Sequence, residues 1–320
     1  MLSKGLLVLT KIQAYLQSAN TGAPGMSDEI IEEAGERFKM ILRKTFNQTR
    51  GDNFRFSLSS YGRPECISMM ERDKAPKEKQ TYAFRMKMLV GDVTELLLRA
   101  IIKASGVAIE KSNQKVTLEL GPLKLNGEYD DRIDGAIYDT KSSAGWTFKN
   151  KWMRGFDEIE KSDSFGYCSQ LFGYAEADKA KAGGWFVVNK ESGEIVLVEA
   201  RDTPELRAKW IKKGEENVYN VINPDHKFRR MFSDLPEYFK KQPTGNRKLD
   251  KPCEFCDYKF SCWPGLKVIP AVKSEAENPP MVYYTVLNPE TQRSEDDSDA
   301  LQVKRRAKKE KKNEANSNPR

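Results

Sequence analysis

The stretch GEYDDRIDGAIYDTKSS, residues 127–143, contains the feature that most limits how this chain can fold. The dipeptide Asp134-Gly135 stands between two runs of strand-forming residues. It is a strong signal for a two-residue type I′ hairpin, whose central residues both need positive φ. A turn at this point sets the strand register. The opposed pairs are then Ile133 and Ala136, Arg132 and Ile137, Asp131 and Tyr138, and Asp130 and Asp139.

This register gathers charged side chains on one face of the hairpin. Directly opposed residues project to the same side, and Lys141, two residues beyond Asp139, shares that side with Asp130. Two carboxylates only about 5 Å apart repel each other unless a cation lies between them. Oxygen-rich clusters suit Mg²⁺ or Mn²⁺, and a nearby lysine can orient or deprotonate a metal-bound water. The alternative is a solvated hairpin in which Lys141 simply pairs with an acid.

The composition narrows the chemistry and the cellular location. His226, in the loop-like NPDHKF, is the only histidine, which argues against a histidine-based triad or a histidine-rich zinc site. Catalysis must then depend on carboxylates, lysine or thiolates. No run approaches the roughly 18 apolar residues of a membrane span, and no secretory signal is evident. We expect a cytoplasmic protein (in the host cytoplasm if it is viral), whose net charge of +7 is compatible with a polyanionic partner.

Hydrophobic periodicity predicts a mixed succession of helices and strands. This order indicates an α/β or α+β core. Residues 1–25 read as a flexible leader. The chain from 274 onward reads as a disordered charged tail, whose basic block either contacts nucleic acid or is simply solvated. The expected elements are helices near 27–46, 86–104, 164–181 and 203–222, short strands over 116–141, and a hairpin over 183–200.

Three of these segments together resemble a known family. GEYD, then DTKSS, then FGYCSQLFGYAEA are similar to the core of the PD-(D/E)xK nuclease superfamily, over roughly residues 60–265. The nearest branch is that of the RecB-like exonucleases and their CRISPR-associated relatives, in the form often carried by tailed phages. The resemblance implies a restriction-endonuclease-like α/β fold, with a central mixed sheet flanked by helices. It also implies metal-dependent hydrolysis of phosphodiester bonds.

The resemblance assigns roles to residues of the hairpin. Asp130 matches the first metal-binding aspartate, and Asp139 and Lys141 match the (D/E)-x-K pair. The carbonyl of Thr140 is a plausible further metal ligand.

Two helices would supply the remaining site residues. Gln170 and Tyr174 match a Q-x-x-x-Y motif whose i, i+4 spacing puts both on one helix face, where they could position DNA or the attacking water. Tyr174 could equally be a core residue. Glu95 stands where many relatives carry histidine and others glutamate, and it could complete the metal shell. Otherwise it is an exposed acid paired to Arg99 at i+4.

The segment PCEFCDYKFSCW contains three cysteines with C-x₂-C-x₅-C spacing. Three thiolates need a fourth ligand, and the far upstream Cys66 is the candidate. In the family, this arrangement implies a [4Fe-4S] cluster that ties the N-terminal helical region to the end of the core; Zn²⁺ is the alternative, and unligated cysteines are the remaining reading. Cys168 is expected to be an ordinary buried thiol. The proposed cluster ligands are Cys66, Cys253, Cys256 and Cys262.

These features together predict a metal-dependent DNA exonuclease that acts on linear ends or single strands, in DNA recombination, replication or degradation. The nuclease domain would span 26–273, including the cluster. The segment KFRR at 227–230 could guide the DNA backbone, and Trp263 could stack bases. A helicase or single-strand annealing protein is a common partner in such families. The alternatives are a structure-specific endonuclease and a non-catalytic DNA-binding protein with a zinc or iron–sulfur staple.

Overall fold

The structure, a computed structural model, describes residues 3–21, 25–47, 54–272, 274, 276 and 278–289. The chain divides into two compact units. The first consists of Met1–Asp73 and Gln80–Phe228, and the second of Lys74–Lys79 and Arg229–Arg320. The span 26–273, predicted as one nuclease domain with its cluster, extends over both units, and the strands after residue 234 pair with one another in a sheet of their own.

The first unit is built on a five-stranded mixed sheet with strand order β1-β2-β3-β4-β5. Its central neighbours β3 and β4 are parallel, and all other neighbours are antiparallel. A parallel pair needs a crossover connection, which the helical segment between β3 and β4 provides. The strands are β1 Lys111–Leu120, β2 Leu123–Ile133, β3 Ala136–Ser143, β4 Lys181–Asn189 and β5 Ile195–Glu199.

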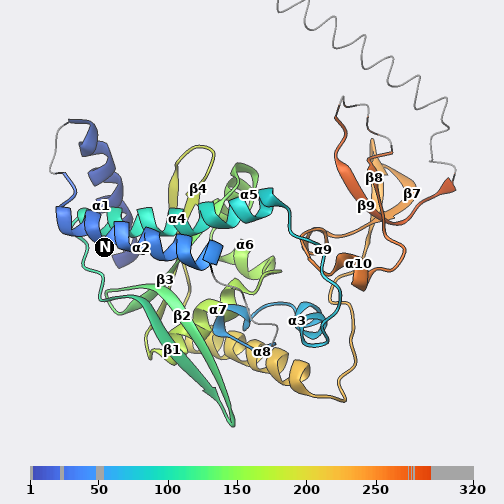
Figure 1. The fold of residues 1–320 in the computed structure, drawn as a ribbon, viewed down its shortest axis with the longest axis horizontal. Coiled ribbons are helices and arrows are strands. Elements are labelled where there is room, and N and C mark those ends of the chain that lie inside the picture. Colours follow the sequence, from blue (N-terminus) through green and yellow to red (C-terminus); the bar gives the residue numbers. More distant parts are fainter. Residues whose placement is uncertain are drawn as a thin grey trace, which may run out of the picture. The chain divides into compact units, whose positions relative to one another are not determined.

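Helices cover both faces of this sheet (Figure 1). Successive side chains of a strand point to opposite faces, and the neighbours Ile137 and Tyr138 accordingly belong to two different buried clusters. Helices α1 (Lys4–Ser18) and α4 (Tyr82–Ala104) pack around the cluster that contains Tyr138. Helices α7 (Tyr167–Ala177) and α8 (Pro204–Ile222) pack around the cluster that contains Ile137. The predicted mixed sheet flanked by helices is thus confirmed.

Helix α1 contradicts the prediction of a flexible leader. Val8 and Ile12 are buried, and Ile12 is fully inaccessible among Leu98, Ile102 and other residues of α4 and the sheet. A helix of this length has little stability alone, so its local sequence gives a weak signal. Its order comes from burying this narrow apolar stripe.

Most of the other predicted elements of the first unit are confirmed. Helix α2 (Asp28–Asn47) lies beside α4 (Figure 1), although none of its side chains is fully buried. The β4–β5 hairpin forms, and Thr203 caps α8 through a hydrogen bond from the amide of Leu206. The remaining elements are short: α3 Glu65–Arg72, α5 Gly145–Asn150, α6 Phe156–Lys161, and the 3₁₀ turns Ala19–Thr21, Leu58–Ser60 and Trp152–Arg154.

The second unit contains a four-stranded antiparallel sheet with strand order β6-β7-β9-β8. Strand β9 falls in the predicted disordered tail, so that prediction is wrong for its residues. Tyr284 of β9 is buried and donates a hydrogen bond from Oη to Oε1 of Glu237 at 2.6 Å. The charged runs at 294–299 and 304–312 lie outside the described residues. The elements are β6 Leu235–Phe239, β7 Gln242–Lys248, α9 Lys251–Glu254, α10 Lys259–Cys262, β8 Lys267–Pro270 and β9 Met281–Val286.

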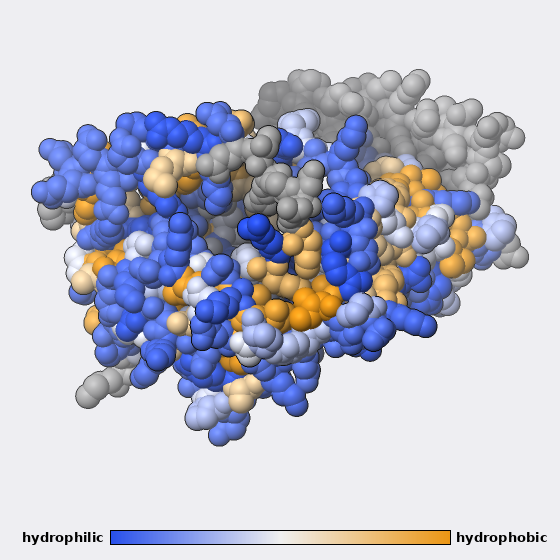
Figure 2. All heavy atoms as spheres, turned by 60° about the horizontal axis from the view of Figure 1, so that its bottom comes forward, coloured by the Kyte–Doolittle hydropathy of each residue, from blue (hydrophilic) through white to orange (hydrophobic). Residues whose placement is uncertain are grey.

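Both hydrophilic and apolar side chains contribute to the surface. Figure 2 shows a face that is largely hydrophilic, with apolar side chains gathered in a few patches. Among the described helices, none combines the length and the apolar content needed to span a bilayer.

Candidate active site

The β2–β3 hairpin has the register that its turn predicts. Asp131 pairs with Tyr138, Arg132 with Ile137 and Ile133 with Ala136. Asp134 and Gly135 have φ values of +52° and +74°, as a type I′ turn requires. The observed pairing ends at Asp131 and Tyr138, and Asp130 and Asp139 are the next residue of each strand.

A backbone hydrogen bond fixes Asp130 to the neighbouring strand. Its Oδ2 accepts from the amide of Thr140 at 2.7 Å, and Thr140 stands between Asp139 and Lys141. The carboxylate of Asp130 therefore lies beside the strand segment that carries the other two predicted site residues. Asp139 is only 5% exposed, and Asp130 is half-buried.

The carboxylates carry more negative charge than the site neutralises. Burial, and then the charges of Asp139 and Glu95, raise the pKa of Asp130 well above its ordinary value. Burial also raises the pKa of Asp139, against the effect of Lys141. A carboxylate whose pKa is raised in this way is desolvated, and the nearby positive charges compensate for it poorly. The pair would be stabilised by an additional cation.

Lys141 is the cation closest to this pair. Its Nζ lies 2.5 Å from Oδ2 of Asp139, a buried oxygen that makes no hydrogen bond of acceptable geometry within the described part of the chain. Burial opposes the charged lysine, but Asp139 and Asp130 outweigh it, so the pKa of Lys141 is raised. Lys141 is therefore protonated at neutral pH. It can supply positive charge and a hydrogen bond, whereas deprotonating a water is disfavoured.

Glu95 reaches the hairpin from α4 and interacts electrostatically with Asp130 and Asp139. The alternative pairing with Arg99 is also present, since Nη2 of Arg99 donates to Oε1 of Glu95 at 2.9 Å. This pair is not a loose surface contact, because Arg99 is only 5% exposed. The same pairing therefore holds Glu95 beside the hairpin.

Arg99 organises this side of the site, a role that the sequence did not indicate. Its Nε donates to Asp131, Nη1 to the side chain of Asn113, and Nη2 to the carbonyl oxygen of Asp130 as well as to Glu95. One guanidinium thus connects α4 with β1 and β2. The i, i+4 spacing of Glu95 and Arg99 was visible in the sequence, but the burial of Arg99 was not.

The predicted motif on α7 lies next to the carboxylates. Tyr174 is buried in the core, and burial is the main cause of its raised pKa, with smaller effects from Asp139 and Asp130. The side chain of Gln170 hydrogen-bonds that of Tyr174. Tyr174 is therefore a core residue, as the alternative interpretation of the sequence had it. It also borders the candidate site.

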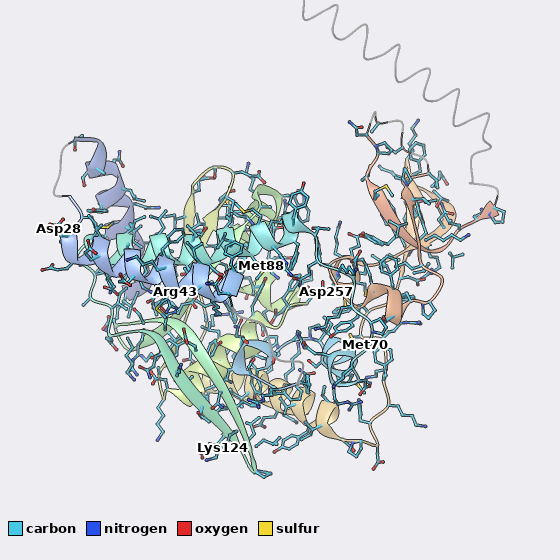
Figure 3. The ribbon with its side chains drawn as sticks, viewed as in Figure 1. Asp28, Arg43, Met70, Met88, Lys124 and Asp257 are labelled. Atoms are coloured by element: carbon cyan, nitrogen blue, oxygen red, sulfur yellow. The ribbon has the colours of Figure 1, made fainter. Side chains whose placement is uncertain are left out.

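A groove of about 580 Å³ adjoins this cluster and is lined by Glu95, Asp130 and Tyr174. Helix α2 lines its other side with Arg37, Arg43 and Lys44. Figure 3 labels Arg43 on α2, which runs beside α4. The sequence predicted α2 but not its place at the groove, because helical periodicity does not reveal which other element a helix faces.

The donor chemistry of Glu95, Asp130 and Asp139 fits a hard divalent cation, which prefers carboxylate oxygens. The raised pKa values of Asp130 and Asp139 agree with this. Within the described residues, however, no three histidine, cysteine, aspartate or glutamate side chains are arranged as a ready ligand set. Lys141 lies against the oxygen that a cation would use, so a bound cation would require this contact to loosen.

The predicted cluster ligands belong to both units. Cys66 is a buried residue of α3 in the first unit, whereas Cys253, Cys256 and Cys262 lie on or between α9 and α10 in the second. The amide of Tyr258 donates to Sγ of Cys256 at 3.4 Å, the type of contact that tunes sulfur ligands in metal sites. The four-thiolate cluster remains a prediction from the sequence. Cys168 is fully buried in the core of the first unit, as expected for an ordinary thiol.

The two predicted DNA contacts of the second unit touch each other. The guanidinium of Arg230 lies 4.1 Å from the ring centroid of Trp263, and its Nε and Nη2 donate to the carbonyl oxygen of Cys262. These contacts give Arg230 and Trp263 a local structural role beside the cysteine segment.

Comparisons with known proteins find similarity only at the level of structure. No protein-family model matches the chain, and no curated protein is similar enough to count as a match. The crystal structure of SSO0001 is 13% identical with a TM-score of 0.40, over 71% of this chain and 95% of that one. The crystal structure of a candidate exonuclease from Eubacterium rectale is 14% identical with a TM-score of 0.35, over 58% of this chain and 84% of that one.

Proposed function

We propose that this protein is a metal-dependent deoxyribonuclease of the PD-(D/E)xK type, acting as an exonuclease on DNA ends or single strands. One observation carries the proposal. The carboxylate of Asp130 accepts from the amide of Thr140, next to Asp139 on the adjacent strand, the pKa values of both acids are raised, and Lys141 pairs with Asp139. Two acids in so poorly solvated a place cost stability unless a bound cation compensates for their charge.

Each residue has a distinct part in this proposal. Asp130, Asp139 and Glu95, with the carbonyl of Thr140, would hold one or two Mg²⁺ or Mn²⁺ ions. Such ions activate water and stabilise negative charge on a phosphate. Lys141, protonated because of its raised pKa, orients the water and stabilises developing charge. Gln170 and Tyr174 support this arrangement from α7.

DNA as the substrate is supported by the charge of the groove. Arg43 and Lys44 of α2 line it together with Arg37, which pairs with Glu128, and these cationic side chains can bind phosphates of a strand while the acids bind the metal. The family resemblance of the hairpin and of the Q-x-x-x-Y motif points to the same substrate.

The cysteine segment is a separate part of the proposal. We infer that Cys253, Cys256 and Cys262, with Cys66, hold a [4Fe-4S] cluster, and zinc is the alternative. Purification without oxygen, followed by assays for iron and acid-labile sulfide, distinguishes the two. A brown protein with equal iron and sulfide supports the cluster, whereas a colourless protein that contains zinc supports the alternative.

The nuclease proposal is tested by incubating the anaerobically purified full chain with end-labelled linear DNA, single- and double-stranded, and with covalently closed circles. Reactions contain Mn²⁺ or Mg²⁺, and Lys141→Met is assayed in parallel. Lys149→Ala serves as the control, because Lys149 is an exposed lysine on α5.

Shortening of linear DNA by the wild type and by Lys149→Ala, but not by Lys141→Met, with intact circles, is the expected result. Nicking of circles would replace the exonuclease assignment with an endonuclease. Absence of cleavage by the wild-type protein with its cysteine site loaded would overturn the proposal.

A further inference from the structure

An exposed aromatic ring lies next to the candidate active site, in the loop between α6 and α7. Phe165 is 49% exposed, and its ring stacks on that of Tyr167 with centroids 5.7 Å apart and an interplanar angle of 21°. Nζ of Lys141 lies 5.5 Å from the centroid of the same Tyr167 ring. Tyr167 therefore connects the exposed ring to the proposed catalytic lysine.

A second lysine accompanies these rings. Nζ of Lys151 lies 5.0 Å from the centroid of Tyr167 and 6.0 Å from that of Phe165. It donates to the carbonyl oxygen of Ser162 at 3.3 Å, and within the described residues no carboxylate lies in ion-pair contact with it. Burial lowers its pKa, against the longer-range effect of acids such as Asp163. A half-buried ammonium of this kind would gain from an anionic ligand.

The loop is held in place before any ligand arrives. Both carboxylate oxygens of Asp163 accept backbone hydrogen bonds, Oδ1 from Gly166 and Tyr167 and Oδ2 from Cys168. Gly166 has a φ of +82° and packs so closely on the backbone of Gly62 that a Cβ atom would not fit. Phe165 is thus presented by a rigid turn, which reduces the entropy lost on binding.

From this arrangement we propose that Phe165, Tyr167 and Lys151 form a binding subsite for one unpaired nucleotide of a DNA strand, next to the phosphate that is cut. The base stacks on Phe165, and Lys151 contacts a neighbouring phosphate. Aromatic platforms combined with cations are how proteins bind single strands without reading their sequence. A base in a duplex is already stacked on both faces, so the subsite selects unpaired DNA. This inference rests on the proposed nuclease function and specifies its substrate.

Binding without cleavage tests the subsite. Affinity is measured for a labelled single-stranded oligonucleotide and for the same strand in a duplex, with Ca²⁺ in place of Mg²⁺ and with the DNA checked to be intact. The variants are Phe165→Leu, which keeps an apolar side chain but has no aromatic face, and Phe165→Trp, which keeps one. Lys151→Met keeps the length of the lysine and removes its charge. Thermal denaturation of each variant confirms that it is folded.

We expect Phe165→Leu to weaken single-strand binding roughly five- to a hundredfold, as base–aromatic stacking predicts. Duplex binding should change by less than about twofold, because the subsite holds no paired base. Phe165→Trp should bind like the wild type. Lys151→Met should lower the slope of log affinity against log salt for the single strand by about 0.7, the value for one phosphate contact. Phe165→Leu should leave that slope unchanged.

The outcomes separate this inference from the nuclease proposal. If the wild type cuts DNA but Phe165→Leu binds single strands as well as the wild type, or loses duplex binding equally, the subsite is wrong and the nuclease stands. If the wild type cuts no DNA but Phe165→Leu weakens single-strand binding and not duplex binding, the subsite stands as a binding site and the nuclease proposal is wrong. Absence of single-strand binding by the wild type would overturn the subsite.

Discussion

The guanidinium of Arg99 donates from Nε to Oδ1 of Asp131 at 2.7 Å, and both side chains are almost completely buried. Asp131 follows the proposed metal ligand Asp130 directly in β2. The ion pair therefore fixes the strand that presents Asp130, while the same guanidinium holds Glu95 on α4. The position of two proposed ligands therefore depends on Arg99, which also lines the groove.

Replacing Arg99 by methionine should destabilise the first unit by about 3–5 kcal/mol, because Asp131 is left as an uncompensated buried charge. Urea denaturation measures the change. The double variant Arg99→Met/Asp131→Asn should recover a large part of this loss, and Arg37→Met, at a less buried arginine, should change stability by no more than about 0.5 kcal/mol. Equal instability of the single and double variants would contradict the ion-pair explanation.

The raised pKa of Asp130 predicts how stability changes with pH when no divalent cation is present. An acid whose pKa is higher in the folded state binds its proton more tightly there, so its unfavourable contribution grows as pH rises from the ordinary aspartate pKa through the raised value. At neutral pH, Asp130→Asn should be more stable than the wild type, because an asparagine side chain carries no charge to desolvate.

This difference should shrink as the pH is lowered through the raised pKa, which denaturant titrations at several pH values would show. Asp134→Asn is the control, because Asp134 lies in the exposed turn, where asparagine is equally suited. A difference between Asp130→Asn and the wild type that does not depend on pH would argue against a raised pKa at this position.

Binding of a divalent cation should stabilise the protein through Asp139. With Mn²⁺ at a hundred times its dissociation constant, mass action predicts a gain of about 2.7 kcal/mol. Asp139→Asn should lose most of this gain, and Asp134→Asn should keep it. Thermal denaturation with and without Mn²⁺ measures both. Equal stabilisation of the two variants would place the cation elsewhere.

Helix α1 offers a test of its unexpected burial. Ile12→Ala should cost about 2–5 kcal/mol, as is typical when a large apolar side chain is removed from a core. Leu7, on the same helix, is 51% exposed, and Leu7→Ala should change stability by no more than about 0.5 kcal/mol. Chemical denaturation compares the two. Similar small effects would mean that α1 does not contribute to the core.

Local sequence signals predicted the hairpin in detail. A two-residue turn with positive φ at both positions leaves one register for its strands, so the opposition of Asp131 and Tyr138 followed from Asp134-Gly135 alone. Helix α8 was likewise predicted over 203–222 from its periodicity, and Thr203 caps it. These elements are encoded within a few residues, and tertiary packing agrees with them.

Helix α1 and the strands of the second unit were not predicted. Helix α1 and strand β9 are stabilised by burying a few residues, such as Ile12 and Tyr284, against segments far away in the sequence. Helix α1 has an N-cap at Ser3, but a cap alone does not stabilise a helix of this length. The division into two units was missed for the same reason, since a sheet is defined by pairing between distant strands.

The sequence by itself therefore determined the mixed α/β core, the hairpin register and the side-by-side placement of Asp130, Asp139 and Lys141. Only the tertiary structure decided what surrounds them: the buried Arg99 that holds Glu95, the basic face of α2 along the groove, and the stacked pair Phe165 and Tyr167 beside Lys141. The physical reason is the separation along the chain over which each interaction acts. Turn geometry and strand alternation act between neighbours in the chain, whereas burial, charge compensation and ring stacking depend on which distant elements the folded core brings together.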